Sequence, residues 1–326
     1  MLTSNKKFIH EINFYSKKKI PFIFFIDSDC KNYVVQPVSE VDSSELLFDF
    51  NGVTNFRDKQ NLWHEQIITK TIPIGFASYK AAFDIIHDNQ SNGNSYLANL
   101  TMPTQIELSI SLENIFKVSR SKYKLWYKDH FVFFSPEIFI KIENNKISSY
   151  PMKGTIDASI ENAEEKILQN EKELAEHITI VDLIRNDLSI VADKVTVEKF
   201  RYIDKISAGS KNLLQVSSKI TGELPCGYQE SLGNLLSLLM PAGSVTGAPK
   251  RKTVEIIKEA ENYERGYYTG VCGYYDGKDL DSCVMIRFIE KVNHKYYFKS
   301  GGGITIYSDV YSEYQELLDK IYVPAY

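Results

Sequence analysis

The first half of the chain is a series of short apolar runs, a pattern typical of β-strands. Ile20–Ile26 is almost wholly apolar, and Leu46–Phe50 is a second short run that ends before Asn and Gly. In Gly75–His87 the apolar residues recur at helical spacing, which predicts an amphipathic helix that ends at Asp88-Asn89. Further strands are predicted at Tyr96–Thr101, Ile106–Ser109, Tyr123–Tyr127, Phe131–Phe134, Ile138–Ile142 and Ile147–Tyr150, with a hairpin turn at Asn144-Asn145.

The second half alternates between helical and strand-like patterns. Ser159–Asn186 is charged and carries apolar residues at helical spacing, which predicts one long helix. Further helices are predicted at Leu232–Met240, Lys252–Glu261 and Ser312–Tyr322, and strands at Val195–Tyr202, Leu213–Thr221, Tyr267–Tyr275, Cys283–Lys291 and Tyr296–Lys299. The alternation is too irregular for a doubly wound sheet, and no repeat or linker divides the chain. We therefore expect one α+β domain over residues 1–326.

Composition narrows the classes of function without selecting one. Of the 326 residues, 43% are hydrophobic and 25% are charged, as in ordinary globular proteins. The net charge of −4 provides no basic stripe for nucleic acid, and the longest apolar run is too short to cross a membrane. None of the four cysteines forms a C-x-x-C pair, and Met1–Lys7 lacks the apolar stretch of a secretory signal. These features predict a cytoplasmic protein that binds neither nucleic acid nor a membrane.

Two pairs of glutamates at i,i+3 spacing are candidates for a metal site. Glu173 and Glu176 share one face of the long charged helix, and Glu313 and Glu316 share one face of the last helix. If these faces turn toward each other, they offer only oxygen ligands, which suit Mg²⁺. Acidic pairs on helices are more often simply solvated, so the spacing alone leaves both interpretations open.

Small residues gather in two segments where a ligand could approach the backbone closely. The loop Pro241–Lys250 precedes a helix, and N–H groups at such a position attract carboxylates or phosphates. Gly301–Gly303 closes a predicted strand. Either segment could equally be a tight turn or a strand bend. Arg287 is predicted within a strand and needs a partner there, either a carboxylate ligand or an internal ion pair.

Glu137 and Lys153 are the candidates for acid and nucleophilic chemistry. Glu137 follows an aromatic strand, where apolar surroundings would favour its neutral form and suit a general acid, although a strand-end Glu is more often exposed. Lys153 lies between a strand-like segment and Gly154, and a lysine near a metal and an anionic substrate can be a nucleophile. A surface lysine is the plainer alternative. The sixteen-residue separation suits a strand, a turn and a return strand, which would bring the two side chains together.

Longer motifs occur in order between residues 125 and 322. They are Lys153-Gly154-Thr155, Ala175-Glu176-His177, Val181–Leu188, Gly243–Lys250, Gly301–Ile304 and Glu313–Glu316 followed by Lys320. Together they resemble the chorismate-utilising enzymes, a family that includes anthranilate, isochorismate and salicylate synthases and the large subunit of aminodeoxychorismate synthase. The catalytic core would be residues 125–322, and residues 1–120 would be an abbreviated N-terminal portion.

The resemblance implies a fold and a binding site. The fold is two facing antiparallel β-sheets flanked by helices, with the active site in the cleft between them. Mg²⁺ would be held by Glu176 and Glu316, with Glu173 and Glu313 as direct or outer ligands, and would bind the ring carboxylate of chorismate. The two carboxylates of the substrate would be held by backbone N–H groups near Thr246, Gly247, Gly302 and Gly303 and by the side chains of Arg287 and Lys320.

Lys153 separates the branches of this family. Members that add ammonia or water directly at C2 of chorismate usually carry Ala in this motif, whereas aminodeoxychorismate synthases carry Lys, as in Pro-Met-Lys-Gly-Thr here. By resemblance, Lys153 attacks C2 while Glu137, as general acid, helps to expel the C4 hydroxyl. Ammonia then enters at C4 as Lys153 leaves, which gives 4-amino-4-deoxychorismate. Anthranilate synthase component I and a non-catalytic regulatory homologue are the alternatives.

The same resemblance implies partners and exposes one departure. The family receives ammonia from a glutamine amidotransferase with a Gly-x-Cys-x-Gly elbow, and no cysteine here has that setting. We therefore expect a separate amidotransferase subunit, followed by an aminodeoxychorismate lyase in para-aminobenzoate and folate synthesis. Gln215 stands where the family commonly has a His that faces the substrate ring, so the ring contact is expected to differ.

Overall fold

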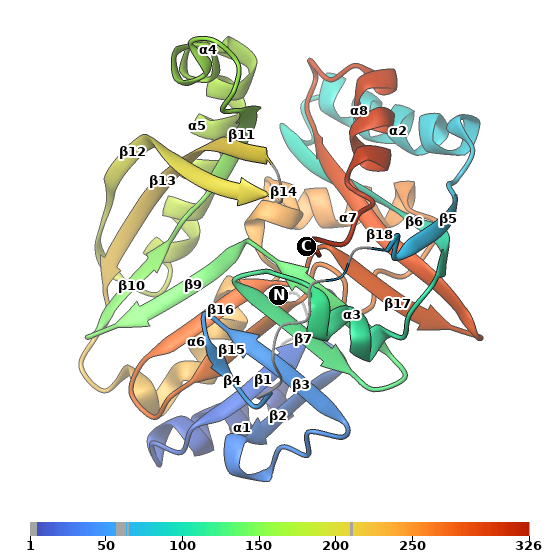
Figure 1. The fold of residues 1–326 in the computed structure, drawn as a ribbon. Helices are drawn as coiled ribbons and strands as arrows, with labels where there is room; N and C mark the ends of the chain where they lie inside the picture. Colours follow the sequence, from blue (N-terminus) through green and yellow to red (C-terminus); the bar gives the residue numbers. More distant parts are fainter. Residues whose placement is uncertain (1–4, 57–62, 64, 209–210, 326) are drawn as a thin grey trace.

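The chain forms two antiparallel β-sheets packed face to face, with helices around them (Figure 1). A computed structural model describes residues 5–56, 63, 65–208 and 211–325. The segment Met1–Lys7, which is predicted to lack a secretory signal, lies partly outside these residues. The expected α+β class with two facing antiparallel sheets is confirmed. Within the described residues, no helix is long and apolar enough to cross a membrane.

The first sheet carries the strand of Lys153. Its described strands, in spatial order, are β11 (Met152–Asp157), β13 (Lys211–Glu223), β10 (Lys146–Ser149), β9 (Ile138–Glu143), β16 (Leu280–Val284), β15 (Val271–Tyr275), β1 (Phe22–Ile26) and β2 (Tyr33–Pro37), with β12 (Asp193–Ala208) also paired to β13. Strands β10 and β11 pair with successive parts of β13, and the chain between them contains Pro151. This arrangement carries the chain from the β9–β10 hairpin directly to Lys153.

The second sheet carries the triple glycine. Its described strands, in spatial order, are β14 (Gly247–Ala248), β6 (Leu97–Leu108), β18 (Lys295–Ile304), β17 (Phe288–Val292), β8 (Phe131–Ser135), β7 (Tyr123–Tyr127), β3 (Leu46–Phe50) and β4 (Val53–Thr54), with β5 (Ile68–Ile72) also paired to β6. The residues Gly301–Gly303 lie inside β18, opposite Asn99–Thr101 of β6. The prediction that these glycines close the strand is therefore wrong.

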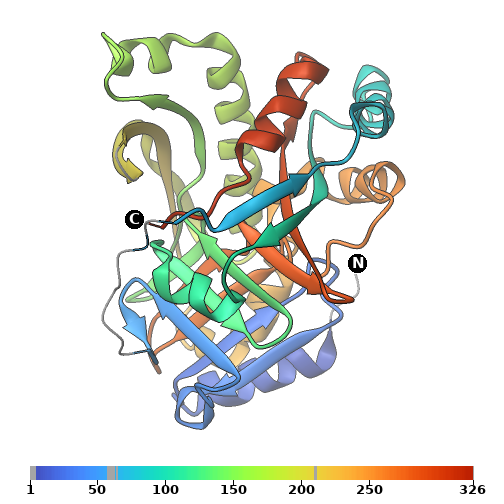
Figure 2. The ribbon, with the colours of Figure 1, turned by 45° about the vertical axis from the view of Figure 1, so that its right-hand side comes forward.

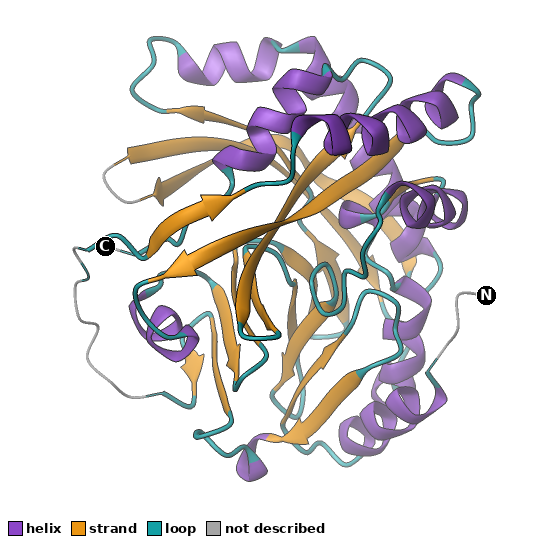
Figure 3. Ribbon diagram, turned by 90° about the vertical axis from the view of Figure 1, so that its right-hand side faces the viewer, coloured by secondary structure: helices purple, strands orange, loops and turns teal. Residues whose placement is uncertain are grey.

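Helices cover the outer faces of both sheets, as Figures 2 and 3 show. The described helices are α1 (Lys6–Lys17), α2 (Phe76–Ser91), α3 (Leu112–Val118), α4 (Ala163–Gln169), α5 (Glu171–Ser189), α6 (Leu232–Leu239), α7 (Lys250–Ala260) and α8 (Val310–Asp319), with short 3-10 turns at Val38–Glu40, Tyr228–Ser231 and Gly243–Val245. Apolar residues of α1, α5 and α6 pack in one cluster with the first sheet, and those of α2, α7 and α8 pack with the second.

Strand β1 explains why an apolar run without alternation forms a strand. All five of its residues are buried. Phe22, Phe24 and Ile26 pack in the outer cluster beneath α1 and α6, whereas Ile23 and Phe25 pack between the two sheets. Both faces of the strand are therefore in apolar surroundings, so each position favours an apolar side chain.

The predicted strand Cys283–Lys291 is wrong as a single element. It divides into β16 in the first sheet and β17 in the second, and the chain crosses between the sheets at Met285–Arg287. Arg287 has a φ of 53°, which is incompatible with a continuous strand. The apolar pattern does not reveal this crossing. Residues 283–285 and Phe288 are all buried, so they are apolar here just as they would be in one continuous buried strand.

Other boundaries also differ from the sequence prediction. The helix predicted over Ser159–Asn186 is two helices, because Asn170 ends α4 and its side chain caps α5 by accepting a hydrogen bond from the Glu173 N–H.

The two strands predicted between Tyr96 and Ser109 are one, β6. Pro103 is tolerated within β6 because the two strands beside it, β5 and β14, pair with other residues of β6 and leave Pro103 unpaired on that side. The predicted turn at Asn144-Asn145 is confirmed, and both residues have positive φ. Helices α1 and α3 were not predicted.

Candidate active site

A cavity of about 520 Å³ lies between the two sheets and is lined by residues of both. Its volume is in the range of small-molecule binding sites. The predicted site residues in its wall are Glu137, Lys153, Glu173, Glu176, Gln215, Arg287, Gly302, Gly303, Glu313, Glu316 and Lys320. The structure therefore brings together, in one cavity, side chains that are separated by more than 180 residues in the sequence.

Lys153 reaches from the first sheet toward the second. Its Nζ lies 3.3 Å from Oε2 of Glu176, and its side chain is 22% exposed. A Cβ placed on Gly303 of β18 would lie only 2.9 Å from the same Nζ, so the glycine makes room for the amine. Gly154 has a φ of 81°, a conformation that favours glycine, and a Cβ there would meet the Glu173 carboxylate at 3.2 Å. Gly303 therefore leaves room for the Lys153 amine, and Gly154 leaves room for the Glu173 carboxylate near that amine.

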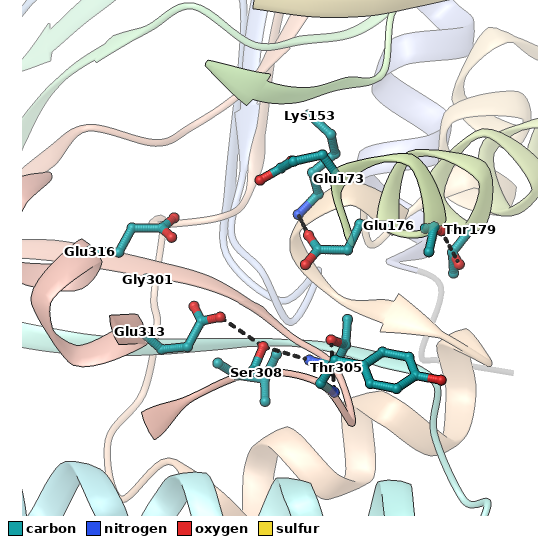
Figure 4. A network of polar contacts seen from close by, with 12 residues as sticks. Lys153, Glu173, Glu176, Thr179, Gly301, Thr305, Ser308, Glu313 and Glu316 are labelled. Carbon is teal, nitrogen blue, oxygen red and sulfur yellow. Dashed lines mark hydrogen bonds and ion pairs between the residues drawn. The ribbon is translucent and has the colours of Figure 1, made fainter. Parts of the chain in front are cut away.

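The two glutamate pairs face the same space, from α5 on one side and α8 on the other (Figure 4). On α8, Glu313 is buried and accepts a 2.7 Å hydrogen bond from Ser308 Oγ, whereas Glu316 lies 2.6 Å from Lys320 Nζ. A Cβ on Gly302 would lie 3.4 Å from a Glu313 oxygen and 3.6 Å from a Glu316 oxygen. The glycine therefore leaves open space beside both carboxylates.

The donor set fits Mg²⁺ in chemical type. Four carboxylates around one space supply hard oxygen ligands, and neither thiolate nor imidazole is among them. Within the described part of the chain, no three His, Cys, Asp or Glu side chains are close enough together to hold a metal as they stand. Lysine amines contact one carboxylate of each pair, Glu176 and Glu316. Mg²⁺ would have to compete with Lys153 and Lys320 for these two groups, with water and substrate oxygens completing its coordination.

Glu137 immediately precedes β9 and lines the cavity. Its Oε1 accepts a hydrogen bond from Ser244 Oγ, and its backbone N–H donates to Ser135 Oγ at 3.1 Å. Burial raises the pKa of the Glu137 carboxyl group, and the hydrogen bond from Ser244 and the positive charges of Lys153, Lys320 and Arg287 offset this only in part. A carboxyl group that keeps its proton to higher pH than usual is suited to act as a general acid.

Arg287 and Lys320 form a cationic wall on the side of the second sheet. Arg287 donates a 3.1 Å hydrogen bond from Nη1 to the carbonyl of Lys320, and its guanidinium lies 4.9 Å from the ring centroid of Tyr322. Lys320 donates to the carbonyl of Gly301 at 2.7 Å. The strand position predicted for Arg287 is wrong, since the residue lies where the chain crosses between the sheets. That crossing is what brings its side chain to the cavity.

The remaining predicted contacts divide into two groups. Gln215 lines the cavity from β13, where it pairs with Thr155 of β11. Thr246 and Gly247 lie outside the cavity wall. Thr246 is buried and directs its hydroxyl to the carbonyl of Ala242 at 2.9 Å, and its N–H bonds to the carbonyl of Gly243. A Cβ on Gly247 would meet the carbonyl of Leu97 at 1.8 Å, so that glycine serves the packing of β14 against β6.

Several polar residues of the wall were not predicted as site residues, and Ser244 and Asp187 are two of them. Ser244, in the same small-residue motif, contacts Glu137, and Asp187 of α5 forms a 2.6 Å ion pair with Lys250. Both lie within motifs that resemble the family, Gly243–Lys250 and Val181–Leu188. The available signal was the Ser244 hydroxyl itself, which lies between Gly243 and Val245 in the small-residue loop.

Comparison with known proteins assigns the family. The profile described as "chorismate binding enzyme" matches residues 30–325. The chain belongs to the chorismate-binding enzymes. Among these relatives, the chain is 46% identical to an uncharacterized PabA-like protein of Pasteurella multocida over 97% of this chain and 98% of that protein. It is 31% identical to aminodeoxychorismate synthase component 1 of Bacillus subtilis over 75% of this chain and 54% of that protein.

The fold of this chorismate-binding enzyme also occurs in a solved relative. Anthranilate synthase component I from Streptococcus pneumoniae superimposes with a TM-score of 0.68 and 25% identity, over 79% of this chain and 60% of that chain. The two-sheet architecture predicted from the motifs is therefore the fold of the family. The cavity between the sheets is accordingly the candidate site for chorismate.

Proposed function

We propose that this chain is the synthase subunit of an aminodeoxychorismate synthase, which aminates chorismate at C4 to give 4-amino-4-deoxychorismate. The observation that carries the proposal is the position of the Lys153 amine, which lies in the cavity between two acidic helix faces and against Gly303. The similarity to the Bacillus subtilis aminodeoxychorismate synthase component 1 supports the same activity. Anthranilate synthase is the second candidate, favoured by the similarity to the Streptococcus pneumoniae structure.

The proposed first step uses Lys153 and Glu137 together. The neutral Lys153 amine forms a bond to C2, the ring double bonds shift, and the bond between C4 and its hydroxyl oxygen breaks. The hydroxyl takes the proton of Glu137 and leaves as water, so Glu137 becomes a carboxylate and the bound nitrogen carries the positive charge. The burial that raises the pKa of Glu137 lets the carboxyl group keep this proton to higher pH than an exposed glutamate would.

The proposed second step restores both residues. Ammonia attacks C4, the double bonds shift back, and the bond from C2 to the Lys153 nitrogen breaks, which returns the neutral amine. The new C4 ammonium gives one proton to the Glu137 carboxylate. Chorismate and ammonia thus become 4-amino-4-deoxychorismate and water, with no net change in either side chain.

The charges of the wall suit a substrate with two carboxylates. Arg287 and Lys320 supply positive charge on the side of the second sheet, and the Gly302 backbone leaves room beside them. Glu173, Glu176, Glu313 and Glu316 are the residues that would hold Mg²⁺. When bound, the metal would supply positive charge beside the ring carboxylate as the ring acquires charge during substitution.

The proposal includes two protein partners. Ammonia would come from a separate glutamine amidotransferase subunit, and an aminodeoxychorismate lyase would act on the product in para-aminobenzoate and folate synthesis. The name of the Bacillus subtilis relative, component 1, supports a multi-subunit enzyme. The expected location is the cytoplasm, where such small-molecule pathways operate.

Replacing Glu176 with Gln is expected to raise the Mg²⁺ concentration needed for half-maximal chorismate consumption by at least about 10-fold, because one charged ligand is lost. Direct binding of Mn²⁺, followed by electron paramagnetic resonance, should weaken in the same variant. Glu198→Gln is the matched control, since Glu198 pairs with Lys146 and Lys219 outside the cavity. Consumption of chorismate that persists in a chelator would contradict the metal dependence, and no consumption at any Mg²⁺ concentration would favour a non-catalytic homologue.

A further inference from the structure

The hydroxyl of Ser244 makes the one described side-chain hydrogen bond to the Glu137 carboxyl group. Ser244 lies in the 3-10 turn Gly243–Val245, at the junction between the two sheets, and Glu137 lies more than a hundred residues earlier. The hydroxyl donates to Oε1 of Glu137. Because Oε1 is occupied as an acceptor, a proton on the neutral carboxyl group is placed on Oε2.

We propose that Ser244 is a positioning residue that fixes which oxygen of Glu137 carries the proton delivered to the substrate. The inference rests on the proposed function, in which Glu137 protonates the departing C4 hydroxyl. In that step Oε2–H gives its proton to the leaving oxygen, and the resulting carboxylate keeps the Ser244 hydrogen bond on Oε1. The hydrogen bond is stronger to the carboxylate than to the neutral acid, so it favours release of the proton.

The turn that carries Ser244 is held on several sides, so its hydroxyl has a fixed position. Arg265, whose side chain is 8% exposed, donates to the carbonyl of Val245 at 2.8 Å and pairs with the buried Glu261. The Thr246 hydroxyl donates to the carbonyl of Ala242 at 2.9 Å. A buried ion pair and a buried hydroxyl thus brace the backbone on either side of Ser244.

The acid is held equally firmly on its own side. The carbonyl of Glu137 accepts the N–H of Val284 at 3.1 Å, and its N–H donates to Ser135 Oγ. Removal of the Ser244 hydroxyl would therefore leave the carboxyl group in place but free to rotate about its last bond. The positive charges that act on it remain in that case, namely Lys153 of β11, Lys320 after α8 and Arg287 between the sheets. Burial raises the pKa of Tyr268 and the pKa of Cys283 of β16, and the nearby Glu137 charge raises both further, so they stay neutral beside it.

The test compares Ser244→Ala with wild type in two measurements. The first is the titration of the Glu137 carboxyl carbon by NMR in protein labelled with ¹³C-glutamate, with the resonance assigned by its loss in Glu137→Gln. Loss of a hydrogen bond to a carboxylate is expected to raise the midpoint by about one pH unit. The second is the pH profile of kcat, whose alkaline limb should move upward by the same amount while kcat falls about 10-fold and KM changes little.

Two variants make the outcome decisive. Ser244→Thr restores a hydroxyl and is expected to return the midpoint to the wild-type value. Ser282→Ala removes another fully buried hydroxyl, whose described hydrogen bonds are to the backbone of Ile140 and not to Glu137. This variant should leave the midpoint of Glu137 unchanged. An unchanged midpoint in Ser244→Ala would overturn the inference, as would equal shifts in both alanine variants. The titration needs no turnover, so it remains informative if the product proves to be other than 4-amino-4-deoxychorismate.

Discussion

Replacing Lys153 with Ala is expected to lower kcat for chorismate amination by at least about 10³-fold, because the proposed covalent step has no other nucleophile. The amine lies 3.3 Å from Glu176 and is held against Gly303, so a shorter side chain leaves the C2 position without an attacking group. Steady-state kinetics with ammonium as nitrogen source measures the effect directly. Binding of chorismate, followed by calorimetry, should weaken far less than turnover.

The control for this variant is Lys141→Ala. Lys141 forms a 2.9 Å ion pair with Asp281, and its side chain has the same 22% exposure as Lys153, but it lies outside the cavity wall. The control should retain wild-type kcat within about 2-fold, as expected for a partly exposed ion pair away from the site. Equal rates in Lys153→Ala and wild type would refute covalent catalysis by this residue.

Replacing Glu137 with Gln is expected to lower kcat by about 10²- to 10⁴-fold, the range attributed to a positioned general acid. The amide can still accept the hydrogen bond from Ser244 but has no acidic proton for the leaving hydroxyl. Since burial raises the pKa of Glu137, the acid is protonated below that raised pKa and loses its proton as pH rises through it. Wild-type kcat should therefore fall on the alkaline side, and the residual rate of the variant should lack that limb.

Glu143→Gln is the matched control for the acid. Glu143 is an exposed residue at the far end of β9, the strand that follows Glu137, and its replacement should leave both kcat and the pH profile unchanged. If Glu137→Gln kept wild-type turnover, or lost turnover while retaining the same alkaline limb, Glu137 would not be the general acid.

Local patterns in the sequence predicted the α+β class and the shared faces of several candidate site residues, whereas the two facing sheets were implied by the resemblance to the chorismate-utilising enzymes. The i,i+3 spacing predicted that each glutamate pair shares one helix face, whereas the spacing alone did not predict that both faces turn to one cavity. Lys153 and Glu137 were predictable as neighbours because a tight hairpin at Asn144-Asn145 returns the chain. These features depend on residues close together in the sequence.

Features that depend on long-range packing were not predictable in the same way. Arg287 reaches the cavity only because the chain crosses between sheets, and no local pattern separates that crossing from a strand. The contact of Ser244 with Glu137 joins segments more than a hundred residues apart. The hydroxyl of Thr246 bonds to the carbonyl of Ala242 within its own turn, and the residue type alone does not predict this contact. Each depends on partners that a single sequence does not identify.

The identity of the amination product tests the central claim most directly. The purified chain is incubated with chorismate, Mg²⁺ and ¹⁵N-ammonium, and the product is identified by mass spectrometry and by its fluorescence, with and without an added amidotransferase plus glutamine and an added lyase. The account predicts non-aromatic 4-amino-4-deoxychorismate with ¹⁵N at C4, which the lyase converts to para-aminobenzoate. Fluorescent anthranilate, with nitrogen at C2, would contradict it.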